Sequence, residues 1–291
     1  MSAINRENAR DVLSNILSNL STPSWWWSGS HYQGYPRYQG LFDIDDTRPS
    51  HRPGRDIAAV RDLLFASMRD EVFEIFGEPN MMPRKETLWK KAGDISKAQR
   101  GIYLHIIEGT DNRLRFFVGQ SDNMSFHIRR QLRNSRYRRE NSSLHGYAMQ
   151  KSRWDYFVIL AVLPPGPTAA EFTDQEQALL ANILCMWCAL LSCTLQPSTM
   201  EGWQAGQANR MPWTGLNLAC PLDHGAEGQY VNWRHALSES EDSLKRSYVT
   251  EVLDKRRELT PFRGLVLGLG IGVFVAVWIA SLRSPHGRRG K

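Results

Sequence analysis

The segment GIYLHIIEGTDNRLRFFVGQS, residues 101–121, predicts an antiparallel pair of short strands. Apolar residues predominate in 102–107 and again in 114–118. The turn between them, EGTDN, carries Gly109 and Asn112, residue types that accept the backbone conformations of a tight turn. The chain is therefore expected to contain a sheet that begins with a hairpin.

The residues after this hairpin extend it to a β-β-α-β-α order. Residues 123–132 have a helical pattern, and a basic loop is expected from there to about residue 150. Residues 156–163 are apolar throughout, which predicts a strand that is buried on both faces. Thr173 and Glu176 form the signature of a capping box before a long apolar helix. We therefore expect the α+β class, with a small three-stranded sheet flanked by helices.

Helical patterns also occur outside this region. We expect an amphipathic helix over 5–20, a single helix over 56–76 and a charged amphipathic helix over 237–259. The expected organisation is, in chain order, a helical and aromatic-loop extension (1–94), the sheet domain (95–222), a linker with an amphipathic membrane-proximal helix (223–263), an apolar segment (264–282) and a short basic tail (283–291).

The apolar segment GLVLGLGIGVFVAVWIASL has 19 residues and no charge. A helix of that length is about 28 Å long, close to the roughly 30 Å hydrocarbon core of a bilayer. We expect a transmembrane helix rather than a buried core helix. Because only RSPHGRRGK follows it, we expect a tail anchor with the domain in the cytosol, and the basic tail favours the mitochondrial outer membrane over the endoplasmic reticulum. Gly264, Gly268 and Gly272 recur every four residues, which favours a homodimer through this helix.

Charge and cysteine content narrow the environment and the partners. The net charge of +6 and the pI near 9.2 favour a polyanionic partner or an anionic membrane surface. Four cysteines fit a reducing compartment without a disulfide framework. Cys185 and Cys188 lie within one apolar helical pattern, so we expect buried core residues rather than a zinc site.

The β-β-α-β-α order, with Gly101-Ile102-Tyr103 on its first strand, resembles the GIY-YIG nuclease domain. Further elements in the expected order are Gly119-Gln120-Ser121, the segment SLHGY at 143–147 and Gly215-Leu216-Asn217. The segment PLDHG at 221–225 is similar to the ending of GIY-YIG domain-containing proteins of filamentous fungi. The resemblance covers roughly residues 95–222.

The resemblance implies metal-assisted hydrolysis of a phosphodiester, with Mg²⁺ or Mn²⁺ as the cofactor. Family members use two strand tyrosines, a helix arginine on the phosphate, a nearby His or Tyr, and a glutamate that holds the metal. Carried over to this chain, the implied catalytic positions are Tyr103, Phe117, His127, Arg129, His145 and Tyr147. Glu176 is the candidate metal ligand, and its alternative role is as a helix cap.

Three positions depart from the family pattern. Phe117 stands at the second tyrosine and lacks the hydroxyl, and His127 stands at the arginine. Arg129 is two positions further along, a rotation of about 200° around the helix. Cys185 stands at the glutamate, and a thiolate is a poor ligand for Mg²⁺. These departures predict a catalytically degenerate domain, although whether the chain is an enzyme stays open.

A basic strip lies beside these positions. Residues 113–139 contain eight arginines, no lysine and one acidic residue, Asp122, and Phe126 and Tyr137 are interleaved with the arginines. This composition predicts binding to the backbone of a nucleic acid, and the alternative is a solvated charged face. The arginines expected to bind are Arg130, Arg133, Arg136, Arg138 and Arg139.

Three functional hypotheses remain open. The favoured one is a tail-anchored GIY-YIG-like protein that no longer cleaves and that binds nucleic acid or a protein partner. The second is a working divalent-metal-dependent endonuclease that uses Tyr103, His145 and Glu176. The third is a membrane scaffold without a role in nucleic-acid binding.

Overall fold

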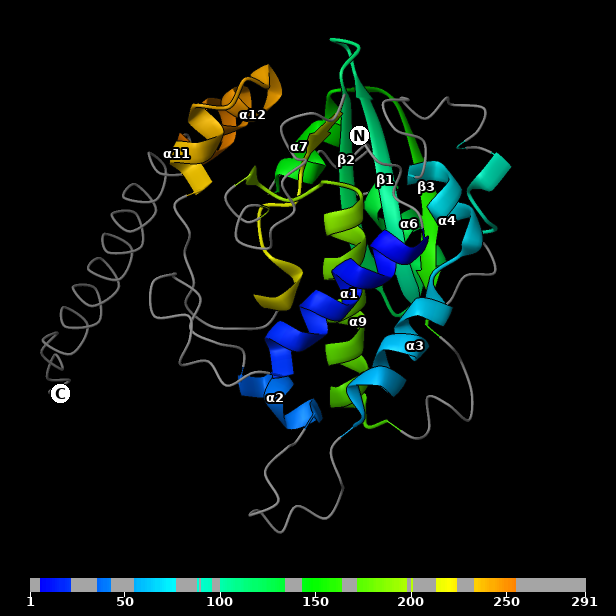
Figure 1. Cartoon of the computed structure of the whole chain (residues 1–291). Coiled ribbons are helices and arrows are strands. Elements are labelled where there is room, and N and C mark those ends of the chain that lie inside the picture. Colours follow the sequence, from blue (N-terminus) through cyan, green and yellow to red (C-terminus); the bar gives the residue numbers. More distant parts are fainter. Residues whose placement is uncertain are drawn as a thin grey trace, which may run out of the picture. The chain divides into compact units, whose positions relative to one another are not determined.

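The computed structural model describes residues 6–21, 36–42, 55–76, 88, 90–95, 100–133, 143–163, 172–197, 200, 213–223 and 233–254. The chain divides into two compact units, Met1–Val231 and Asn232–Lys291. In its described part, the first unit has a four-stranded sheet flanked by helices, which confirms the predicted α+β class (Figure 1).

The sheet has the strand order β3-β1-β2-β4. The central strand β1 (Gly101–Gly109) pairs antiparallel with β2 (Leu114–Ser121) and with β3 (Ser152–Val162), so the predicted hairpin is confirmed. A short fourth strand, β4 (Trp213–Gly215), pairs parallel with β2. The prediction of three strands was therefore wrong, because a three-residue strand has no alternation that a sequence pattern can reveal.

Parts of both edges of the sheet are covered by polar pairing from outside the long strands. Beyond β4, the side chain of Asn217 replaces a strand residue: its Oδ1 accepts from the Val118 N–H at 2.8 Å, and its Nδ2 donates to the Val118 carbonyl at 2.7 Å. On the other edge, Met68 forms a bridge with Ala161, and the Ile159 N–H donates to the Ala92 carbonyl at 2.8 Å. The paired part of each edge is shielded from pairing with another chain.

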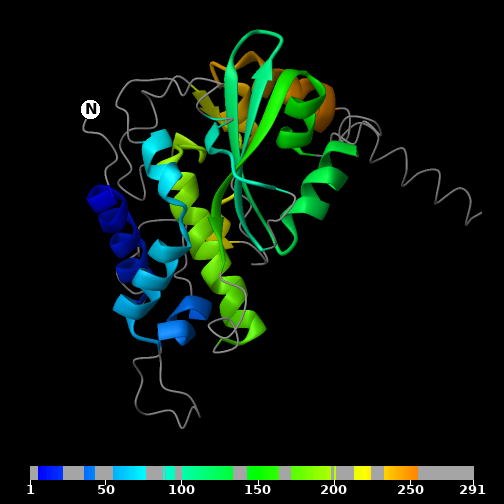
Figure 2. The same ribbon diagram turned by 90° about the vertical axis from the view of Figure 1, so that its right-hand side faces the viewer.

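Two layers of helices enclose the sheet (Figure 2). One face packs against α9 (Asp174–Leu191), beside which lie α1 (Arg6–Ser21) and α3 (Ile57–Ser67). The other face packs against α6 (Met124–Leu132) and α7 (Leu144–Gln150). All nine residues of β1 are buried, because successive side chains alternate between these two layers.

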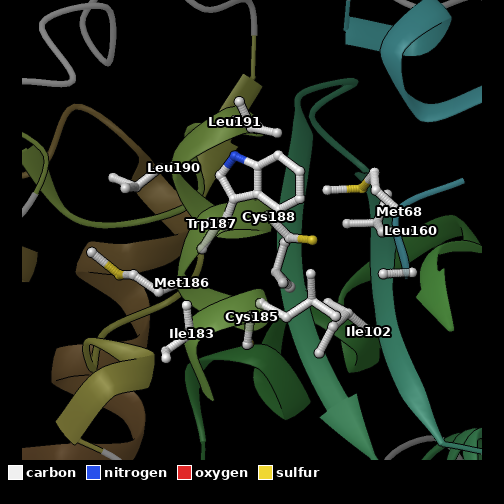
Figure 3. Packing of buried hydrophobic residues seen from close by; sticks show 14 of the residues in the cluster. Met68, Ile102, Leu160, Ile183, Cys185, Met186, Trp187, Cys188, Leu190 and Leu191 are labelled. Atoms are coloured by element: carbon white, nitrogen blue, oxygen red, sulfur yellow. The ribbon is translucent and has the colours of Figure 1, made fainter. Parts of the chain in front are cut away.

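The larger core lies on the α9 side of the sheet. Figure 3 shows Trp187, Cys185 and Cys188 of α9 packed with Ile102 and other apolar side chains from the strands. The indole N–H of Trp187 donates to the Ala9 carbonyl of α1 at 2.9 Å. The helices of the predicted N-terminal extension therefore share one core with the sheet.

The single helix expected over 56–76 is interrupted. It forms α3 and then α4 (Asp70–Phe76), because Met68 adopts an extended conformation and bridges to Ala161 at the edge of β3. Arg69 strengthens the break, since its backbone N–H donates to the Leu160 carbonyl at 3.0 Å. Pairing with the sheet therefore outweighed the helical pattern at this point.

The loop expected up to residue 150 contains the helix α7. Ser143 begins α7 as its N-cap, and its hydroxyl accepts from the Gly146 N–H at 3.0 Å. The capping box predicted for Thr173 and Glu176 is present at the start of α9, and the helix predicted over 5–20 is confirmed as α1. The short helix α2 (Pro36–Phe42) also contributes side chains to the core of the first unit.

The second unit contains α11 (Trp233–Ser238), α12 (Ser243–Tyr248) and the π-helical segment η5 (Val249–Asp254) in its described part. The continuous helix expected over 237–259 is therefore wrong between Ser238 and Ser243. Asp242 caps α12 by accepting from the Leu244 N–H at 3.0 Å, and side chains that bond to nearby backbone in this way compete with a continuous helix.

The predicted membrane anchor at 264–282, with Gly264, Gly268, Gly272 and the basic tail, lies outside the described residues. In the part of the chain that the structure describes, no helix combines the length and apolar character that crossing a membrane requires.

Candidate functional site

Four of the residues predicted from the sequence lie together on the sheet face covered by α6 and α7. The ring centroids of Tyr103 and His127 are 6.0 Å apart, and the rings of Phe117 and His145 stack at 3.9 Å. Tyr103 on β1 lies opposite Gly119 on β2. A Cβ at Gly119 would overlap the Tyr103 hydroxyl, so glycine at this position makes room for the tyrosine.

The side chains of Tyr103, Gln131, His145, His105 and Asp155 are linked by hydrogen bonds, and we call this set the buried polar chain. The Tyr103 hydroxyl donates to Gln131 Oε1 at 3.2 Å, and Gln131 Nε2 lies 2.8 Å from His145 Nδ1. His145 Nε2 lies 2.6 Å from His105 Nδ1, and His105 Nε2 lies 3.0 Å from Asp155 Oδ2. The chain thus connects α6, α7, β1 and β3.

The direction of donation follows from the amide at one end and the carboxylate at the other. Because Gln131 Nε2 only donates, His145 Nδ1 accepts and the His145 proton is on Nε2. That N–H donates to His105 Nδ1, and the remaining N–H of His105 donates to the Asp155 carboxylate. In this arrangement both imidazoles are neutral, and each ring nitrogen has a partner.

Burial disfavours the charged forms of Tyr103, His127 and His145. It lowers the pKa of His145 well below its ordinary value, and the neighbouring His105 and His127 lower it further. Burial raises the pKa of Tyr103. The pKa of His127 is lowered by burial and by Arg130. A proton on His145 Nδ1 would face the amide donor of Gln131, so the geometry disfavours the charged form as well.

Aromatic packing holds the two imidazoles in place. The His105 ring stacks on Phe157 of β3 at 3.8 Å and meets the His145 ring edge-on at 4.9 Å. Phe117 covers the other side of His145. Phe117, which stands where the resemblance implies a second tyrosine, therefore packs against the buried polar chain.

Sequence reasoning missed His105, Gln131 and Asp155. His105 could have been found, because it lies two positions after Tyr103 and therefore on the same face of β1. Gln131 lies four positions after His127 and shares its side of α6. Asp155 carried no local signal, since its hydrogen bond with His105 joins residues 50 positions apart.

The other predicted catalytic positions have different surroundings. Tyr147 is buried in α7, with the Lys151 ammonium 5.4 Å from the centre of its ring. Arg129 is exposed on α6. Cys185 is buried in the α9 core, and burial together with Cys220 raises the pKa of its thiol to about 12.

Glu176 acts as a helix cap. Its carboxylate accepts from the Thr173 N–H at 2.7 Å, its own N–H donates to the Thr173 hydroxyl at 3.2 Å, and its Oε1 lies 3.6 Å from Arg55 Nε. It stands at the start of α9, the helix that covers the opposite face of the sheet from α6 and α7. Within the described ranges, no three His, Cys, Asp or Glu side chains are grouped to hold a metal ion. Binding of Mg²⁺ or Mn²⁺ stays a prediction.

The basic strip is only partly exposed. Arg129, Arg130 and Arg133 are exposed on α6. Arg115 is fully buried and pairs with Asp111 through two hydrogen bonds, of 3.0 and 2.6 Å, so it does not belong to a binding surface. The predicted binding residues Arg136, Arg138 and Arg139 lie outside the described residues.

Comparisons with protein-family models, with curated proteins and with solved structures found no match.

Proposed function

We propose that this chain is a GIY-YIG-like protein that binds nucleic acid through α6 and does not hydrolyse it. The observation that carries the proposal is that the side chains of Arg129, Arg130 and Arg133 are exposed and have no ion-pair or hydrogen-bond partner among the described residues. Unpaired arginines on one helix form a surface suited to phosphate groups, which their planar forks bind in a bidentate manner.

Other arginines in the described part of the first unit differ from these three. Arg10 pairs with Asp62 at 3.1 Å, and Arg100 lies 2.9 Å from Asp122. Arg6 pairs with Asp70 at 2.7 Å. Their positive charge is balanced within the chain, whereas the charge of α6 is left for a partner. Binding of this kind depends on charge and releases counterions, so it requires no reading of base sequence.

Three features support the absence of hydrolysis. The Tyr103 hydroxyl is buried and donates to Gln131. The Glu176 carboxylate is engaged with the start of α9 and with Arg55. The Cys185 thiol, at the position where the resemblance implies a glutamate, is buried with its pKa raised to about 12, so it is protonated at neutral pH.

We further propose, from the sequence, that 264–282 anchors the chain in a membrane.

Removing the three α6 arginines together is expected to weaken nucleic-acid binding. The triple variant Arg129→Ala/Arg130→Ala/Arg133→Ala should bind a labelled oligonucleotide at least about tenfold more weakly at low salt, because hydrogen bonds to charged groups contribute about 1.5–3 kcal/mol each. For a single strand, the slope of log affinity against log salt should fall by roughly 0.7 for each phosphate that the variant no longer neutralises. Fluorescence anisotropy at several salt concentrations measures both quantities.

The matched control removes three positive charges that are already paired. Arg6→Ala/Arg10→Ala/Arg61→Ala lowers the net charge equally on α1 and α3, so it should leave affinity and salt slope nearly unchanged. Equal losses of affinity in the two triple variants would show that net charge alone drives binding. No binding of the unmodified chain at low salt would refute the proposed function.

Incubation of the full chain with labelled single-stranded, nicked and branched DNA or RNA is expected to produce no divalent-dependent cleavage. The reason is that Tyr103 and Glu176 are already committed to hydrogen bonds within the chain. The assay uses Mg²⁺ and Mn²⁺, with gel separation of products. Cleavage that requires the metal and is abolished in both Tyr103→Phe and Glu176→Ala would instead support a working nuclease.

A further inference from the structure

Phe126 of α6 is unusually exposed for a large apolar residue. Its relative exposure is 63%, and within the described ranges it is the large hydrophobic side chain that the fold leaves in solvent. Its neighbours Met124 and Ile128 on the same helix are buried. Among the described residues, the phenyl ring is therefore not part of the hydrophobic core.

Phe126, Arg129, Arg130 and Arg133 occupy positions i, i+3, i+4 and i+7, and we call them the α6 stripe. Residues with this spacing lie on one side of a helix, and from first to last they extend over about 10 Å. The opposite side of α6 is attached to the sheet by Met124, by Ile128 and by the hydrogen bond from Tyr103 of β1 to Gln131. The orientation of the helix thus exposes the ring and the three guanidinium groups together.

We infer that the α6 stripe binds single-stranded nucleic acid, with a base stacked on Phe126 and phosphates on the arginines. This inference rests on the proposed function and specifies the class of nucleic acid that is bound. An aromatic ring beside unpaired cations is the combination that binds single strands without sequence preference, because every base offers a flat face. In a duplex the bases are stacked on one another, so Phe126 meets no free base there.

An anionic membrane surface fits the stripe less well. Helices that lie on membranes bury a broad apolar face in the lipid. In α6 that face is already used by the core, through Met124 and Ile128, and only the ring of Phe126 remains. The stripe also uses arginine without lysine, and the arginine fork matches the oxygens of a phosphodiester.

The test compares the effect of substituting Phe126 on the affinity for two ligands, a single strand and a duplex. Phe126→Ala in the full chain is expected to weaken binding to a 15-nucleotide oligo(dT) by roughly 5- to 150-fold, the range for removing one aromatic ring from under a base. Binding to a 15-base-pair duplex, measured by the same anisotropy assay, should stay unchanged. Phe126→Trp restores a stacking ring and should retain the affinity for oligo(dT). Because Phe126 is exposed, the thermal unfolding midpoint of each variant serves as the check that it is folded.

Each other outcome has a defined meaning. Equal losses of affinity on oligo(dT) and duplex, or no loss on either, would overturn the inference while the arginine-dependent binding of the proposed function stands. Binding to phosphatidylserine vesicles that is as tight as binding to oligo(dT), and that Phe126→Ala abolishes, would overturn it in favour of a membrane surface. No binding to any nucleic acid would refute the proposed function itself.

Discussion

Gly215→Ala is expected to lower the free energy of unfolding by about 3 kcal/mol or more, the upper end of what overpacking usually costs. The added Cβ would overlap the carbonyl oxygen of Thr194 and lie 2.7 Å from its Cα. Both are backbone atoms, which cannot move aside as a flexible side chain can. The same carbonyl accepts from the Asn217 N–H at 3.0 Å, so a shift at Thr194 also disturbs the residue that covers the edge of β2.

Gly40→Ala is the matched control for this substitution. Gly40 lies in α2, and a Cβ there meets nothing within 4 Å. Alanine favours the helix and reduces the freedom of the unfolded chain, so this variant should be stabilised by about 0.5–1 kcal/mol. Urea unfolding of both variants measures the difference. Equal midpoints for Gly215→Ala and the unmodified chain would show that β4 does not pack against Thr194 as described.

Acidification is expected to destabilise the chain from about pH 6.5 downward through His145. The pKa of His145 is lowered in the folded state, so below 6.5 the unfolded state binds more protons than the folded state. The free energy of unfolding then falls as the pH falls, by about 1.4 kcal/mol per pH unit, until the lowered pKa of the folded state is reached. His127, whose pKa is also lowered, adds to the same slope.

His145→Gln tests this assignment. A glutamine can accept from Gln131 through its oxygen and donate to His105 through its amide, without titrating. Urea unfolding between pH 7.5 and 5.5 should show a slope reduced by about one proton relative to the unmodified chain. His235→Gln, which removes an exposed imidazole of the second unit, controls for the loss of a histidine. An unchanged slope in His145→Gln would refute the role of the buried polar chain in the acid response.

The candidate site was predictable where its residues lie close together in the sequence. The hairpin that carries Tyr103 and Phe117 follows from the apolar pattern and the turn residues, and the capping role of Glu176 follows from its spacing to Thr173. The position of His105 on the same face of β1 as Tyr103 could have been predicted from strand alternation. The partners His145 and Asp155 were not assignable to it, because their side chains meet His105 from 40 and 50 positions away.

Arg115 illustrates how a composition argument fails. Composition groups it with a solvent-exposed strip, because eight arginines lie within 113–139. Its position in β2 turns it toward the interior, and Asp111, at the hairpin turn, pairs with it. Arg129, Arg130 and Arg133 remain exposed because they lie on the outer side of a helix. Composition counts charges, whereas the direction of each side chain depends on the element that carries it.

The hairpin, the capping box and the burial of the α9 cysteines could be predicted from the residues alone, because they depend on periodicity and on interactions between near neighbours. The fourth strand, the break at Met68 and the buried polar chain became visible only in the folded structure. Each of these depends on which distant segments meet. Backbone groups and buried polar side chains must find partners, and only the folded chain determines which ones are within reach.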